Sequence, residues 1–148
     1  MSEVLSAAHR RARAVGWALC GGGPVLVALL MVSGAVPAGR NLPEGPFLQV
    51  GHAFTGLVFL SAAWVLWRRG TVLKDFGQLP PARQSGVLLR ESLLYAALFE
   101  LSSMYGLVYW ALTGRHAAGH AWGFVLCTPF LFLAFFPPLR RWREGAVS

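Results

Sequence analysis

The stretch FLQVGHAFTGLVFLSAAWVLWRR, residues 47–69, decides the class of protein to which this chain belongs. Residues 47–67 contain no acidic residue, lysine or arginine, and Arg68 and Arg69 follow at once. A helix of about 20 apolar residues is long enough to cross the hydrocarbon core of a bilayer. The stretch therefore predicts a membrane-spanning helix that ends at a basic interface.

The composition also indicates a membrane protein, made of one domain. The chain has 148 residues, of which 55% are hydrophobic and 13% charged, whereas a soluble domain carries about 25% charged residues. The net charge is +7, but the basic residues flank the apolar runs and form no separate basic face. We attribute this charge to orientation in a membrane, so the expected partner is the lipid bilayer and not a nucleic acid.

Four apolar runs are long enough to span, at about 15–37, 47–67, 87–112 and 118–136. The bilayer core contains no water to bond with backbone N–H and C=O groups. Each run is therefore expected to be a helix, which pairs these groups internally. The connections at the outer end are short, which makes neighbouring helices antiparallel. The prediction is an all-α, integral membrane, four-helix up-down bundle that forms a single transmembrane domain over residues 1–148. The first run is longer than the apolar part of a signal peptide, so we expect it to stay as an anchor.

The basic residues predict how the spans are oriented. Eleven of the 13 lie at one end of the four spans, and only Arg40 and Arg115 lie at the other. Because positively charged segments stay in the cytoplasm, both termini and the loop 70–86 are expected on the cytoplasmic side of an inner or plasma membrane. The eleven residues are Arg10, Arg11, Arg13, Arg68, Arg69, Lys74, Arg83, Arg90, Arg140, Arg141 and Arg143.

Glu100 is the residue that is most costly to place in a bilayer, and it is our first candidate for chemistry. It lies about 15 Å beyond Arg90 along the third span, close to the midplane, where a carboxylate costs about 3 kcal/mol. Ala96 and Ser103, one turn away on either side, are small, so this face can approach another helix closely. We predict that Glu100 points into the bundle. It is either a protonated structural residue or a site for a proton, an ion or a lipid-like ligand such as a quinone.

A short motif recurs at the outer ends of two spans, as GHAFTG at 51–56 and GHAWG at 119–123. Both spans run inward, so His52 and His120 are candidate axial ligands of one haem b. Counted back from the arginines that follow each span, His120 lies about 6 Å further out than His52. The alternative is that each imidazole bonds to a carbonyl or a neighbouring helix at the interface.

His116 gives a second metal hypothesis, because it stands four residues before His120. On a helix, HxxxH spacing places both imidazoles on one face, which suits a metal ion. The segment 116–120 contains the predicted start of the fourth span, so a solvated loop histidine is the other interpretation of His116.

One part of the sequence resembles a known family. The stretch VGHAFTGLVFLSAAWVLWRR, residues 50–69, resembles the second helix of small membrane-bound b-type cytochrome subunits, and YWALTG at 109–114 resembles the TG helix end in the same families. The resemblance covers 26 of the 148 residues and implies His52 as a haem ligand and Gly56 as a place of close approach by the ring. Those subunits usually offer four histidines for two haems. Here no histidine lies near the cytoplasmic ends of the later spans, so we expect one haem at most.

The first span contains GGGP at 21–24. Three glycines before a proline weaken a helix strongly, so we predict a kink or a break about a third of the way in from the cytoplasm. Broken membrane helices often line binding sites, because their freed carbonyl groups need partners. The alternative is that the glycines only allow close helix packing.

Three functions follow from these residues. In the first, which we favour because it gives His52, His120 and Glu100 related roles, the chain is a membrane subunit of an electron-transfer system that binds haem b and handles quinone or protons. In the second, it is a small carrier or channel that uses Glu100 and forms a homo-oligomer. In the third, it is a non-catalytic accessory subunit of a larger membrane complex. No residue pattern indicates hydrolysis or group transfer.

Overall fold

The computed structural model describes residues 2–39 and 44–147, and in that part of the chain nearly every residue is helical and no strand is present. The all-α prediction is confirmed. In order along the chain the elements are α1 (Ser2–Cys20), α2 (Gly22–Val32), α3 (Glu44–Asp75), the short 3-10 helix η1 (Phe76–Gln78), α4 (Pro81–Thr113), the 3-10 helix η2 (Arg115–Ala117), α5 (Ala118–Phe135) and α6 (Leu139–Val147).

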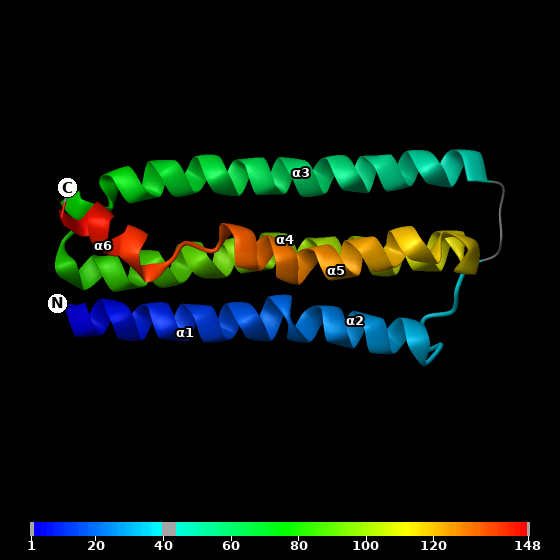
Figure 1. The fold of residues 1–148 in the computed structure, drawn as a ribbon, viewed down its shortest axis with the longest axis horizontal. Helices are drawn as coiled ribbons and strands as arrows, with labels where there is room; N and C mark the ends of the chain where they lie inside the picture. The colour runs from blue at the N-terminus through cyan, green and yellow to red at the C-terminus, as the bar shows by residue number, and fades with distance from the viewer. Residues whose placement is uncertain (1, 40–43, 148) are drawn as a thin grey trace.

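The long helices lie side by side along the longest axis of the molecule (Figure 1). Helices α1 and α2 follow one another as a single rod with one interruption, which we call the α1–α2 rod. Helix α4 contacts this rod, α3 and α5, so it lies at the centre of the fold. Helix α1 begins and α6 ends at the same end of the molecule, on the left of Figure 1.

Three segments are long and apolar enough to cross a membrane by length and composition: Glu3–Val32, Phe47–Gln78 and Ala118–Phe135. They indicate a membrane protein. The predicted third span, 87–112, falls inside α4 and is helical throughout. It does not reach the same hydropathy, because α4 carries charged and hydroxyl side chains along its length.

Several helices continue beyond the apolar runs that predicted them. The first begins at Ser2 and not near residue 15, and α3 runs on to Asp75. With α4 beginning at Pro81, most of the segment 70–86 is helical, whereas the sequence predicted a loop there. The reason is that hydropathy identifies only the apolar part of a helix, which can lie in lipid. Good helix formers such as Arg, Lys, Leu and Gln continue the same helix past the end of the apolar run.

Side-chain hydroxyl groups join α4 to α5. Ser102 donates from its Oγ to the carbonyl oxygen of Phe124 at 2.8 Å, and Thr128 donates from its Oγ1 to the carbonyl oxygen of Phe99 at 3.1 Å. Hydrogen bonds of this kind commonly join helices in a membrane. The hydrophobic effect does not drive helices together there, because lipid tails are as apolar as the side chains. They fix the register of α5 on the central helix.

Helices α4 and α5 also pack closely at Gly106 of α4. A Cβ atom at Gly106 would lie 2.7 Å from the backbone oxygen of Ala121 and 2.8 Å from Cγ2 of Val125. We expect Gly106→Ala to lower the Tm of the purified protein in detergent, since overpacking costs about 1–3 kcal/mol. Thermal unfolding followed by circular dichroism measures the shift.

Gly86→Ala is the matched control, because it lies on the same helix and its added Cβ would meet nothing within 4 Å. Removing a glycine from a helix interior stabilises it by about 0.5–1 kcal/mol, so this variant is expected to keep or raise the Tm. A similar Tm for the two variants would contradict the close α4–α5 contact.

Candidate functional site

The α1–α2 rod is interrupted where the sequence predicted it. Helix α1 ends at Cys20 and α2 begins at Gly22, with Gly21 between them. The N–H of Gly21 still donates to the carbonyl oxygen of Trp17 at 2.9 Å. Pro24 has no N–H, so the carbonyl group of Cys20 loses its usual helical donor four residues on. The break predicted from GGGP is confirmed, and it leaves a backbone oxygen without its ordinary partner.

The carboxyl group of Glu100 lies against this break. A Cβ atom at Gly23 would overlap both carboxyl oxygens of Glu100, so a larger residue there would force the carboxyl group to move. The hydroxyl of Ser103 lies within hydrogen-bond distance of Oε1 of Glu100 and 3.0 Å from its carbonyl oxygen. The other carboxyl oxygen, Oε2, is buried and has no hydrogen-bond partner among the residues that the structure describes. Glu100 is therefore held at one oxygen and unpaired at the other.

Cys20 closes the site on the side of the basic end. Its thiol is fully buried and donates to the carbonyl oxygen of Ala96 at 3.3 Å. Because Ala96 is one turn before Glu100 and has a small side chain, α1 approaches α4 closely at this point. Glu100, Ser103 and the break in the rod thus lie together where the rod meets α4, and the carboxyl group of Glu100 is a group that can hold a proton or a small cation there.

The structure places the two candidate haem ligands at the same end of α3 and α5. His120 is exposed on α5, and the centroid of its ring lies 6.2 Å from that of Tyr109. It lines an apolar cavity of about 410 Å³ between α3 and α5, together with Thr55 and Cys127 among others. His52 is also exposed and lies on α3, one turn before Thr55. His120 is therefore at the rim of the cavity and His52 is one turn outside it.

Ring contacts give the relative depth of these histidines. The ring centroids of Phe54 and Phe124 are 6.2 Å apart, so these two residues lie at similar depth. His52 is then two residues and His120 four residues further out, a difference of about 3 Å at 1.5 Å per residue. The offset is smaller than the sequence predicted, because Arg140, from which the position of His120 was counted, lies on α6 beyond the end of α5 at Phe135.

The HxxxH pair does not lie on one helix. His116 belongs to η2, and α5 begins only at Ala118; the side chain of His116 lies outside the described residues. Within the described residues no group of three or more His, Cys, Asp or Glu side chains forms a metal site.

Sequence reasoning singled out both GGGP and Glu100 but did not place them in contact. Gly23 lies ten residues after Arg13, and Glu100 lies ten residues after Arg90. Both helices run away from the basic end of the molecule. The equal number of residues from Arg13 to Gly23 and from Arg90 to Glu100 was therefore a signal that Gly23 and Glu100 lie at the same depth. Comparison of the chain with protein-family models, curated proteins and solved structures finds no match. The geometry at Glu100 is therefore the main guide to function.

A double-mutant cycle tests the contact between Gly23 and Glu100. We expect Gly23→Ala to lower the Tm, because the added methyl group displaces the carboxyl group. In a Glu100→Ala background, Gly23→Ala is expected to lower the free energy of unfolding by at least about 1 kcal/mol less than it does in the unaltered chain, because the carboxyl group that obstructs the new methyl group is absent. Thermal unfolding in detergent measures all four proteins.

Gly22→Ala is the matched control, because the neighbouring glycine would meet nothing within 4 Å of its added Cβ. Its effect is expected to be the same with Glu100 or Ala at position 100. Equal costs of Gly23→Ala in the two backgrounds would contradict the contact.

Proposed function

We propose that this chain moves a proton or a small cation through a membrane by means of Glu100, and that it does so as a homo-oligomer. The proposal places four spans in an inner or plasma membrane, namely the α1–α2 rod, α3, α4 and α5, with both termini in the cytoplasm. The observation that supports it best is the buried, unpaired Oε2 of Glu100 at the break in the rod.

The central position of α4 supports its role as a span despite its polar residues. The rod, α3 and α5 all contact it, so its polar side chains face protein more than lipid. The end of α3 and the start of α4 lie where α1 begins and α6 ends (Figure 1). Most basic residues of the chain belong to these segments, which supports a cytoplasmic location of both termini.

The geometry of the site supports reversible binding of a cation. An ionised carboxyl group in the membrane interior is costly, and a bound proton or cation removes that cost. The Ser103 hydroxyl contacts Oε1, so Oε2 is the oxygen that accepts the ion. The carbonyl group of Cys20, which loses its donor to Pro24, is a second candidate oxygen at the same break. Backbone carbonyl groups at the breaks of other membrane helices line ion sites.

The test is ion flux across liposomes that contain the purified protein. Glu100→Gln keeps the size and hydrogen bonding of the side chain but cannot ionise, so we expect flux to fall at least about tenfold. Glu144→Gln is the matched control, since Glu144 is exposed on α6 and its ion pair in the described part of the chain is with Arg140; it is expected to leave flux unchanged. If Glu100→Gln transported as fast as the unaltered protein, Glu100 would not be the ion site.

A second function, as the membrane subunit of an electron-transfer system, is favoured by the cavity between α3 and α5. Its walls are apolar and His120 lies at its rim, a combination that fits haem b or the ring of a quinone. His120 would be the first ligand of the iron, and His52, one turn outside, the second. A haem bound there would supply one-electron transfer, and Glu100 would take part in proton handling.

The absorption spectrum of the purified protein tests this second function. A Soret band is expected, and His120→Ala is expected to abolish or shift it while Glu100→Gln leaves it in place. A folded, colourless preparation would exclude the haem. A chain that is both colourless and inactive in flux, and that co-purifies with other membrane proteins, would instead be an accessory subunit.

A further inference from the structure

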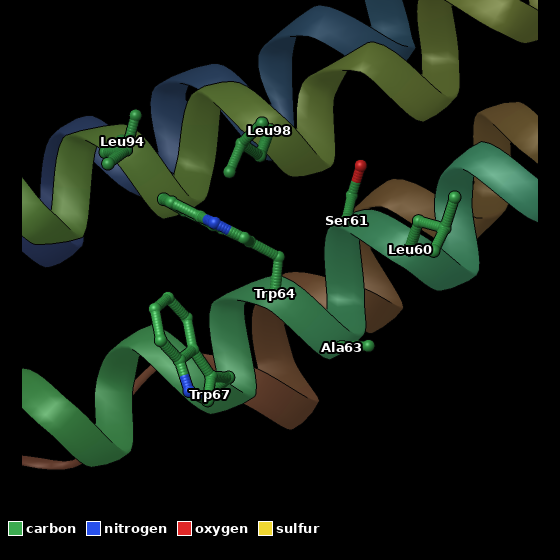
Figure 2. A pocket seen from close by; sticks show the side chains of 7 residues that line it. All are labelled: Leu60, Ser61, Ala63, Trp64, Trp67, Leu94 and Leu98. Atoms are coloured by element: carbon green, nitrogen blue, oxygen red, sulfur yellow. The ribbon is translucent and has the colours of Figure 1, made fainter.

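A groove of about 600 Å³ runs between α3 and α4, on the side of α4 away from the α1–α2 rod. Its walls are almost entirely apolar, and Leu60, Trp64 and Trp67 of α3 face Leu94 and Leu98 of α4 across it. Figure 2 shows the indole of Trp64 reaching from α3 towards Leu94 and Leu98. Leu60 and Trp67 are each 67% exposed, so the groove opens on a surface that lipid covers when the protein is in a membrane.

Both walls of the groove end in an arginine at its basic end. Arg68 lies one turn after Trp64, and its guanidinium carbon is 5.5 Å from the centroid of the Trp64 ring. Arg90 lies one turn before Leu94 on the opposite wall and is exposed. The groove is thus apolar along its length and cationic at one end.

The charge of Arg68 is already balanced. It donates from Nε and Nη2 to the two carboxyl oxygens of Glu91, at 2.8 Å and 2.7 Å. Arg90 takes part in neither of the ion pairs found among the described residues. One positive charge therefore stays unmatched at the mouth of the groove, at the depth where lipid headgroups lie.

We propose that the groove binds an anionic phospholipid, with an acyl chain along Trp64, Leu94 and Leu98 and the phosphate beside Arg90. The inference rests on the membrane placement proposed above, but not on ion movement. An acyl chain is flexible enough to fill an apolar groove between two helices. The headgroup supplies the negative charge that Arg90 lacks, as in other basic pockets on the cytoplasmic side of membranes.

A second copy of the chain is a poorer occupant of the groove. Copies inserted into one membrane have the same orientation, so their basic ends lie at the same depth. A symmetric dimer built on this groove would bring Arg90 near the arginines of its partner, and like charges held together oppose association. The charge at the end of the groove therefore favours a lipid over a protein.

Quenching of tryptophan fluorescence by brominated acyl chains tests the proposal, because Trp64 and Trp67 line the groove. The protein is reconstituted in phosphatidylcholine bilayers that contain a small fraction of brominated phosphatidylglycerol or brominated phosphatidylcholine. The difference between the intact chain and Trp64→Phe isolates the signal of the groove from the other tryptophans. We expect a roughly five-fold preference for the anionic lipid, the ratio that one arginine near the surface provides.

Arg90→Gln is expected to remove this preference. Arg143→Gln is the matched control, because Arg143 is an exposed arginine on α6, at the same end of the molecule, and it is expected to leave the preference intact. The proposal is overturned by equal quenching from the two lipids in the intact protein. It is also overturned if Arg143→Gln lowers the preference as much as Arg90→Gln, since surface charge alone would then be the cause.

An adjacent copy of the chain has its own signature. Ala63→Cys places a thiol in the groove wall, and efficient cross-linking through it, together with weak quenching by both lipids, would mean that protein fills the groove. Ion flux separates this inference from the proposed function. Arg90→Gln is expected to lose the lipid preference and keep the flux, whereas Glu100→Gln is expected to do the opposite.

Discussion

The fold depends on the covering of α4, the central helix, by the other long helices. Its sequence includes Glu100 near the predicted midplane, where hydrocarbon accepts a carboxylate only at a cost of about 3 kcal/mol, and Glu91, which is buried beside Arg68. The α1–α2 rod, α3 and α5 contact α4 and are themselves mostly apolar where they can meet lipid. Each neighbour covers a different face of α4, and each face carries a different feature. The site at Glu100 faces the rod, and the groove with the Arg68–Glu91 pair faces α3.

Much of this arrangement could be predicted from the sequence. The apolar runs and their basic ends predict an all-helical membrane protein, and GGGP predicts the break at Gly21. Helix ends were predicted poorly, because hydropathy falls at the lipid boundary whereas the helix of α3 continues to Asp75. The apolar run 87–112 predicted a third span, but α4, which contains it, is not among the three segments that are apolar enough by composition, because it carries polar residues along its length.

The candidate site was predictable in its parts and not in its assembly. A single sequence does not say which faces of two helices meet, so Gly23 and Glu100 were flagged separately. Helical periodicity predicted the small face of α4 around Glu100, whereas the equal counts from Arg13 to Gly23 and from Arg90 to Glu100 were an unused signal that the two residues share one depth. Both histidines were predicted near the starts of their helices, where the structure places them, whereas the 3 Å offset rests on the contact between Phe54 and Phe124 at about 1.5 Å per residue.

The two acidic residues of α4 are treated in opposite ways, and this contrast favours a functional role for Glu100. Glu91 is 5% exposed in its side chain and meets the guanidinium of Arg68 through two hydrogen bonds, which is how a buried carboxylate is kept charged and fixed. Glu100 has no such cation and meets one hydroxyl, that of Ser103. A carboxyl group retained only for structure would gain by a second partner or by replacement with an apolar residue. One that binds and releases a cation needs an oxygen left unpaired, and Oε2 of Glu100 meets that need.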